Sequence, residues 1–141
     1  MKAIVTGGAG FIGSHLVDLL LEENIAVTVL DNFSTGRPEN LDHVRKQIEL
    51  VKCDLSIPGE WIKQFNNANW VFHLAALADI VPSIQKPEAY FRANVDGTFN
   101  VLQASKASGT KRFIYIASSS CYGIPDTYPT PENAGIRPQY P

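Results

Sequence analysis

The sequence predicts an α/β fold, a doubly wound parallel β-sheet with helices on both faces. Three observations lead to this prediction. Short apolar segments rich in β-branched residues alternate with longer segments that have helical spacing. The apolar segments are continuous rather than alternating, which is typical of strands covered on both faces. A glycine-rich turn, Gly7 to Gly13, lies between the first predicted strand and the first predicted helix.

Each element follows from its own stretch of sequence. Short runs rich in Val, Ile and aromatic residues predict strands at 2–6, 26–30, 48–52, 70–74 and 112–117. Helical spacing of apolar residues predicts helices at 11–24 and 88–108, the second ended by Gly109, and weaker ones near 39–47 and 59–67. Right-handed crossovers then favour the strand order 3-2-1-4-5. From Ser118 onward we expect loop.

The composition narrows the class of protein. The 141 residues suit one domain, and 45% hydrophobic with 18% charged residues is ordinary for a globular protein. A net charge of −2 without a basic block gives no reason to expect nucleic acid or a membrane surface as partner. There is no apolar run of the ~20 residues that span a bilayer, and no signal peptide pattern. We therefore expect a cytoplasmic protein.

The cysteines and histidines are scattered. Cys53 and Cys121 stand alone, with no CxxC pattern, so we interpret them as small buried residues and expect neither a disulfide nor a metal site. His73 follows an apolar run. We interpret it as a packed core or loop histidine rather than a ligand.

The glycine turn TGGAGFIG, from Thr6 to Gly13, predicts a phosphate-binding site. Two registers are open, one using Gly8, Gly10 and Gly13 and the other starting at Gly7. In either register the glycines allow a tight turn, a close approach of backbone to a pyrophosphate, and close packing of helix on strand. The start of the helix adds free N–H groups and the positive end of its dipole.

Two acids follow predicted strands. Asp31 ends the second strand, 18 residues after Gly13, where a carboxylate commonly accepts hydrogen bonds from an adenosine ribose. Such a carboxylate repels a 2′-phosphate and favours NAD over NADP, although Arg37 lies nearby. The alternative is that Asp31 only caps the next turn. Asp54 follows the third strand and either reaches the adenine amino group or caps a helix.

Five stretches together resemble the extended short-chain dehydrogenase/reductase family, within it the NAD-dependent nucleotide-sugar epimerase/dehydratase group. They are TGGAGFIG, LDNFSTG (30–36), HLAA (73–76), NVDGT (94–98) and SSSCYG (118–123). The resemblance implies a Rossmann fold, NAD as cofactor, and an asparagine, Asn94, that holds the loop after the fourth strand. The cofactor-binding residues that it implies are Gly7, Gly10, Phe11, Ile12, Gly13, Asp31, Asn32, Asp54, Leu55, Leu74, Ala75, Ala76 and Asn94.

The same resemblance implies a catalytic hydroxyl. The family's serine or threonine lies four residues before the tyrosine of its YG pair, which here is Ser118 before Tyr122. There its hydroxyl can hydrogen-bond the substrate oxygen that loses and regains a proton. In the dehydratases of the group an Asp–Glu pair follows this position. Here Ser119 and Ser120 follow instead, which makes dehydration less favoured.

The family also uses a tyrosine base with a lysine four residues later, in a pattern like P-x-S-P-Y-x-x-x-K. Pro138 to Pro141 match the first four positions, with Tyr140 where serine is usual. We therefore expect the base to be the next residue and the chain to be an incomplete NAD-binding domain, residues 1–141, without the substrate domain and inactive alone. In the alternative, Tyr140 is itself the base, and the prolines of the chain then lie out of register with those of the pattern.

The resemblance implies the NAD-binding part of an epimerase that acts at C4 of a nucleotide sugar, with a UDP-sugar as substrate, through transient oxidation to a keto-sugar. It also implies a homodimer for the whole protein. One alternative is a UDP-glucuronate decarboxylase, or another nucleotide-sugar dehydratase or reductase. A second alternative, from another class, is a non-catalytic dinucleotide-binding module.

Overall fold

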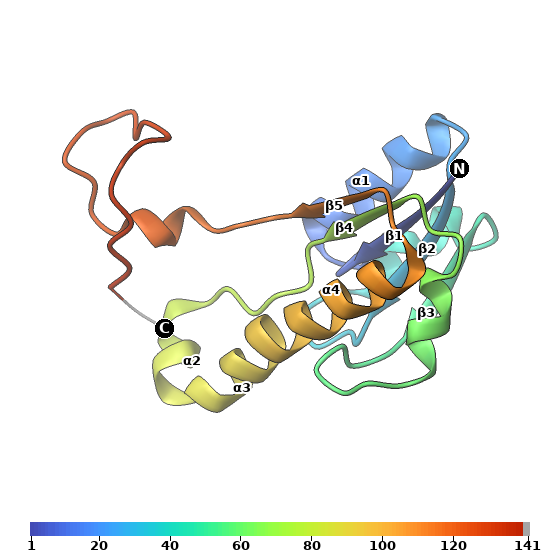
Figure 1. Cartoon of the computed structure of the whole chain (residues 1–141), viewed down its shortest axis with the longest axis horizontal. Helices are drawn as coiled ribbons and strands as arrows, with labels where there is room; N and C mark the ends of the chain where they lie inside the picture. The colour runs from blue at the N-terminus through green and yellow to red at the C-terminus, as the bar shows by residue number, and fades with distance from the viewer. Residues whose placement is uncertain (140–141) are drawn as a thin grey trace.

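The computed structural model describes residues 1–139, and their strands form a five-stranded parallel sheet of order β3-β2-β1-β4-β5 (Figure 1). The predicted fold class and strand order are thereby confirmed. The strands are β1 (Lys2–Thr6), β2 (Ala26–Asp31), β3 (Ile48–Lys52), β4 (Trp70–His73) and β5 (Arg112–Tyr115). Thr6 pairs with Leu30 on one side and with His73 on the other. This register brings the carboxyl ends of the central strands to one edge of the sheet.

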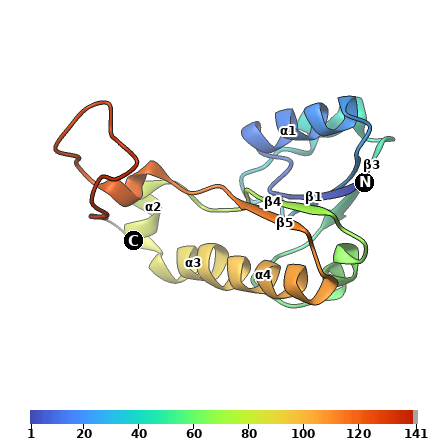
Figure 2. The same ribbon diagram turned by 45° about the horizontal axis from the view of Figure 1, so that its top comes forward.

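Helices cover both faces of the sheet, as Figure 2 shows with α1 above and α3 and α4 below. One face carries the helix α1 (Phe11–Glu22) and the 3₁₀ helix η1 (Pro38–Val44). The other carries the 3₁₀ helix η2 (Glu60–Phe65) and the helix α4 (Gly97–Ser108). The two weakly helical segments of the sequence are thus 3₁₀ turns rather than α-helices.

The strand β1 shows why the apolar runs are continuous. Ala3 and Val5 pack into the core on the α1 side, and Ile4 packs into the core on the α4 side. All three are 0% exposed. Successive side chains of a strand point to opposite faces, so a sheet covered on both faces needs apolar residues at every position.

The predicted helix at 88–108 is in fact three consecutive segments. These are the helix α3 (Pro87–Phe91), the π-helical segment η3 (Arg92–Asp96) and α4. The C-cap Gly109 of α4 has φ 69°, the left-handed conformation predicted from the sequence. A further short helix, α2 (Ile80–Gln85), was not predicted. It contains Pro82, a residue that helices tolerate only near their start.

The segment after β5 leaves the sheet and extends away from it, as the orange and red trace in Figure 1 shows. It is loop as predicted, except for the short 3₁₀ helix η4 (Ser119–Tyr122). Its contacts are largely internal: Arg137 N–H donates to Cys121 O at 2.9 Å, and the Arg137 guanidinium pairs with Asp126. Within residues 1–139 we find no helix long and apolar enough to cross a membrane.

Candidate functional site

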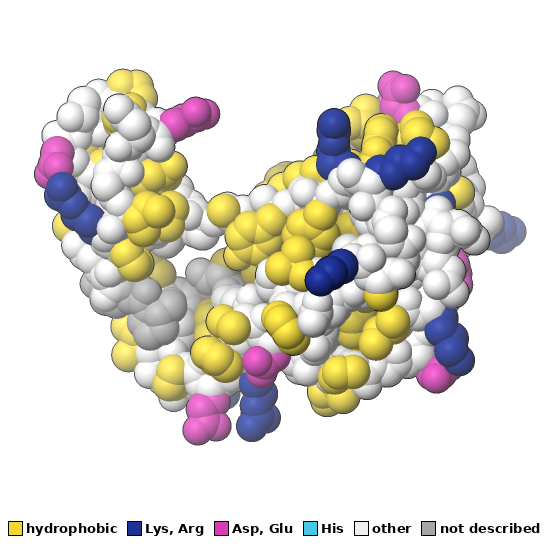
Figure 3. Space-filling model, viewed as in Figure 1, with side chains coloured by type: hydrophobic (Ala, Val, Ile, Leu, Met, Phe, Trp, Pro, Cys, Tyr) yellow, Lys and Arg dark blue, Asp and Glu magenta, His cyan; other side chains and the backbone are white. Residues whose placement is uncertain are grey.

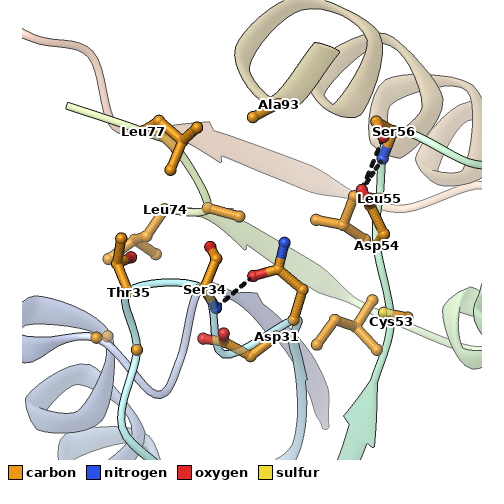
Figure 4. A pocket seen from close by; sticks show the side chains of 18 of the residues that line it. Asp31, Ser34, Thr35, Cys53, Asp54, Leu55, Ser56, Leu74, Leu77 and Ala93 are labelled. Carbon is orange, nitrogen blue, oxygen red and sulfur yellow. Dashed lines mark hydrogen bonds between the residues drawn. The ribbon is translucent and has the colours of Figure 1, made fainter. Parts of the chain in front are cut away.

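A pocket of about 810 Å³ opens at the carboxyl edge of the sheet. Its walls are the glycine turn after β1, the loops after β2, β3 and β4, and the segment of α3 and η3 that crosses above them. Figure 4 shows Asp31, Asp54 and Leu74 around it, each at or just after the end of a different strand. In open α/β sheets this edge, next to the point where the strand order reverses, is where ligands bind.

The glycine turn uses the register that starts at Gly7. Gly7, Gly10 and Gly13 line the pocket, whereas Gly8 is buried against the side chain of Val29. Gly7 has φ +69°, and a Cβ there would lie 2.7 Å from Ala75 N. A Cβ on Gly13 would lie 2.3 Å from Gly7 O. These two glycines are therefore required by contacts within the protein itself.

Gly10 is different. A Cβ on Gly10 would meet one protein atom within 4 Å, Gly7 O at 3.2 Å, and Gly10 lines the pocket. Gly10 is also the N-cap of α1, and it offers no side chain to the free N–H groups of the first turn. The turn thus leaves space and unused donors on the pocket side, which fits the pyrophosphate of a dinucleotide.

Asp31 holds the glycine turn and the loop after β2 together. Its Oδ2 accepts a hydrogen bond from Ala9 N–H at 2.9 Å, and its Oδ1 accepts one from Phe33 N–H at 2.8 Å. The side chain is 7% exposed and lines the pocket. Each carboxylate oxygen has a second lone pair. The capping role and the ribose-binding role predicted for Asp31 are therefore compatible.

The loop after β3 forms the opposite wall. Asp54 accepts hydrogen bonds from the backbone N–H and the hydroxyl of Ser56, so it caps its own turn while it lines the pocket. The Asn100 side chain donates to Leu55 O and Ser56 O and ties this loop to α4. The next helical segment, η2, has Gly59 as its N-cap, so the helix-capping alternative for Asp54 is wrong, while its contact with adenine stays a prediction.

The two cysteines are half-buried, so the interpretation of both as buried residues overstated their burial. Cys53 lies in the same pocket wall as Asp54. Burial, followed by the negative charges of Asp31 and Asp54, raises the pKa of the Cys53 thiol to about 11.

The loop after β4 is fixed by Asn94. The Asn94 amide donates to Leu77 O and accepts from Leu77 N–H, both at 2.9 Å. Asn94 itself does not line the pocket, while Leu74, Ala75, Ala76 and Leu77 do. Asn94 comes from η3, and π-helical turns often occur at functional sites.

Twelve of the thirteen residues predicted to bind the cofactor line this one pocket, Asn94 being the exception. Ser118 does not line it: the residue is exposed, and its hydroxyl oxygen accepts a hydrogen bond from Ser120 N–H at 3.1 Å at the start of η4. Tyr140, the alternative base, lies outside the described residues.

Sequence reasoning missed several residues of the pocket wall. Some belong to the quoted motif LDNFSTG and could have been found there, namely Ser34, Thr35 and Gly36. The others include Ile57, Ala89, Arg92, Ala93, Asp96 and Ile116. Ile57 lies on the loop after β3, the next four lie on α3 and η3, and Ile116 directly follows β5. Asp96 belongs to the quoted motif NVDGT, whereas the others are brought to the pocket by the fold and have no signal in the local sequence.

Comparison with known proteins agrees with this geometry. Residues 3–141 match the model of the NAD dependent epimerase/dehydratase family. The chain belongs to this family. NAD is the cofactor of the family, as predicted. UDP-glucose 4-epimerase 3 of Oryza sativa subsp. japonica is 35% identical over 96% of the chain and 39% of its own length. UDP-glucuronic acid decarboxylase 1 of Arabidopsis thaliana is 39% identical over 94% of the chain and 29% of its own length.

A solved structure of the family shows the same fold. UDP-glucose 4-epimerase from Brucella ovis in complex with NAD superposes with a TM-score of 0.90 at 32% identity, over 99% of this chain and 42% of that one. This chain thus spans well under half the length of the relatives that it matches.

Proposed function

We propose that residues 1–141 form the NAD-binding part, an incomplete Rossmann domain, of a nucleotide-sugar 4-epimerase. The observation that carries the proposal is the pocket, in which the glycine turn, the first turn of α1 and Asp31 converge at the carboxyl edge of the sheet. Similarity to UDP-glucose 4-epimerases over nearly the whole chain supports the substrate class, a UDP-sugar.

The residues of the chain have separate tasks in this proposal. Gly10 and the N–H groups of Phe11 and Ile12 hold the pyrophosphate, and Asp31 accepts hydrogen bonds from the adenosine ribose. Bound NAD supplies a reversible hydride acceptor. Ser118 donates a hydrogen bond to the sugar oxygen at the reacting carbon. The hydroxyl proton would pass to the tyrosine base that the family pattern places after Pro141, and with the loss of the carbon-bound hydride to the cofactor the sugar becomes a keto-sugar. Return of the hydride to the other face of the carbon, and of the proton to the oxygen, would give the 4-epimer.

The test uses the full natural protein with UDP-glucose and UDP-galactose. We expect the protein to interconvert the two nucleotide sugars without net accumulation of NADH. Chromatography of the nucleotide sugars measures the interconversion. Calorimetric titration of the 141-residue chain with NAD tests the binding part separately. Failure of the chain and of the full protein to bind NAD would refute the proposal.

A UDP-glucuronate decarboxylase is the second candidate, favoured by the 39% identity to the Arabidopsis thaliana enzyme. Both reactions begin with oxidation at C4, so the described pocket serves either. UDP-glucuronate in the same assay separates them, because only the decarboxylase releases CO₂ from it. A protein that binds NAD and converts none of these sugars would instead be a non-catalytic dinucleotide-binding module.

A further inference from the structure

A chain of hydrogen bonds crosses the sheet directly behind the pocket. Ala75 N–H donates to Thr6 Oγ1 at 3.2 Å, and Thr6 Oγ1 lies 2.7 Å from His73 Nδ1. On the other side of the ring, His73 Nε2 lies 2.9 Å from Thr98 Oγ1, which donates to Asn94 O at 2.7 Å. The chain connects β1, β4 and the helical segment that carries Asn94.

The direction of every hydrogen bond in this chain can be assigned. A carbonyl oxygen only accepts, so the single hydroxyl proton of Thr98 goes to Asn94 O. Thr98 Oγ1 must then accept from His73, which places a proton on Nε2. A neutral imidazole has one N–H, so Nδ1 is bare and accepts from the Thr6 hydroxyl. Thr6 Oγ1 accepts in turn from Ala75 N–H.

The surroundings of His73 agree with this assignment of its ring protons. The residue is 1% exposed, its hydrogen-bond partners are two neutral hydroxyls, and its ring lies against Phe113 and Tyr115. Burial lowers the pKa of His73 to about 4, so the ring is neutral near pH 7. A second ring proton would face the Thr6 hydroxyl and force that hydroxyl proton away from Nδ1.

The two ends of this series of hydrogen bonds hold the same backbone segment, residues 75–77. Thr6 holds Ala75 by its N–H, and Asn94 holds Leu77 by both its N–H and its carbonyl. Ala75 and Leu77 line the pocket, and Ala75 N is the atom closest to the Cβ position of Gly7. A shift of this backbone therefore moves both a wall of the pocket and a neighbour of the glycine turn.

We propose that His73 is a positioning residue which, as the Nε2–H tautomer, links Thr6 to Thr98 and so fixes residues 74–77 for dinucleotide binding. The proposal rests on the proposed function, because it concerns the affinity of the pocket for NAD. His73 itself does not line the pocket and acts through the backbone of its neighbours.

The first experiment reads the tautomer in the full natural protein without NAD. Nitrogen-15 NMR of the histidine rings at pH 7 should show His73 with a protonated Nε2 and a bare Nδ1. The signal is assigned by its loss in His73→Gln. A protonated Nδ1, or a doubly protonated ring, would overturn the proposal whether or not the protein binds NAD.

The second experiment measures NAD affinity by calorimetry together with thermal stability. Thr98→Val removes the acceptor of Nε2–H, and we expect roughly five- to tenfold weaker NAD binding, the effect of about one hydrogen bond. Thr98→Ser keeps the hydroxyl and should restore the affinity. The matched control is Ser105→Ala, also on α4. The buried Ser105 hydroxyl donates to Val101 O at 2.7 Å, and Ser105 does not line the pocket.

We expect Ser105→Ala to lower the melting temperature without changing NAD affinity. If Thr98→Val likewise lowers the melting temperature without changing NAD affinity, the hydrogen bonds of His73 only stabilise the fold and the proposal is wrong. If the wild-type protein binds no NAD, the proposed function is wrong, and the NMR measurement still decides the tautomer.

Discussion

Asp31 shapes the site through its bonds to Ala9 and Phe33, and we expect it to set the preference among dinucleotides. Its carboxylate is buried at the pocket wall, so the 2′-phosphate of NADP would meet a like charge with little solvent between them. We expect NADP to bind at least about tenfold more weakly than NAD, a difference of about 1.4 kcal/mol. Calorimetric titration of the full natural protein with each dinucleotide measures this ratio.

The variant Asp31→Asn serves as the comparison. It removes the charge and should narrow the difference between NAD and NADP. It should also lower the melting temperature, because one of the two N–H donors, Ala9 or Phe33, then faces an amide NH₂. Equal or tighter binding of NADP by the wild-type protein would contradict the prediction.

Gly10 and Gly13 allow a test of the turn, because an added methyl group meets different surroundings at each. Gly13→Ala should destabilise the protein by about 1–3 kcal/mol, since its Cβ would clash with Gly7 O and Gly8 Cα. Gly10→Ala should cost less stability than Gly13→Ala, since its Cβ would meet only Gly7 O at 3.2 Å, and should weaken NAD binding, since Gly10 lines the pocket. Chemical denaturation and calorimetry measure the two effects, and identical behaviour of both variants would refute this assignment.

His73 should make stability depend on pH. Its pKa is lowered to about 4 by burial, against 6.5 in the unfolded chain, so the unfolded state binds more protons between these values. Stability should therefore fall as the pH falls from about 6.5 to 4, by up to about 3 kcal/mol. Denaturation at a series of pH values measures the slope. The variant His73→Asn lacks the titrating group, and a slope equal to that of the wild type would exclude His73 as the cause.

At the scale of elements, η4 carries the predicted catalytic hydroxyl. Ser118 is its N-cap, whereas Ser119 and Ser120 lie within it, so the three serines occupy different positions of one short turn. We expect Ser118→Ala to lower kcat about 10²-fold in the full natural protein, the usual effect of losing a hydrogen bond to a reacting oxygen. The alanine variants of Ser119 and Ser120 are the controls, and a larger loss at either would show that the register is wrong.

The π-helical segment η3 contributes to the pocket in two ways. Its Ala93 and Asp96 line the pocket, while Asn94 binds the backbone of Leu77 behind the wall. A π turn adds a residue to the helical turn and rotates the following side chains. The motif NVDGT lies at this change of helix type rather than in a regular helix.

At the scale of the molecule, apolar surface remains on both sides of β5. Figure 3 shows hydrophobic side chains gathered over β4 and β5. On β5 and the residue after it, Tyr115 is 55% and Ile116 44% exposed, and on α4 Phe99 is 59% exposed. Such a surface on an edge strand favours aggregation unless another element or a partner covers it. A homodimer of the whole protein stays a prediction.

We therefore expect the 141-residue chain to aggregate and to show no epimerase activity. A chain of the length of its relatives should melt at least about 3 °C higher, the effect of roughly 1 kcal/mol in a domain of this size. Analytical ultracentrifugation, thermal melts and a sugar-nucleotide assay on both chains test this. A monomeric and active 141-residue chain that melts cooperatively would contradict both the stability argument and the predicted position of the base.

The sequence by itself determined the strand order, the glycine turn and the acid after β2. These features depend on local signals, namely continuous apolar runs, glycine at fixed spacing and an acid at a strand end, and parallel topology then brings strand ends together. It also located His73 as a packed residue.

Only the tertiary structure decided the rest. The use of Gly7 rather than Gly8, the π turn at Asn94 and the tautomer of His73 depend on atoms that meet from distant parts of the chain. Whether Asp31 caps a turn or faces a ligand was undecided in the sequence, because both roles use the same carboxylate. Folding places Ala9, Phe33 and the pocket around that carboxylate at once, and no local pattern encodes such a long-range arrangement.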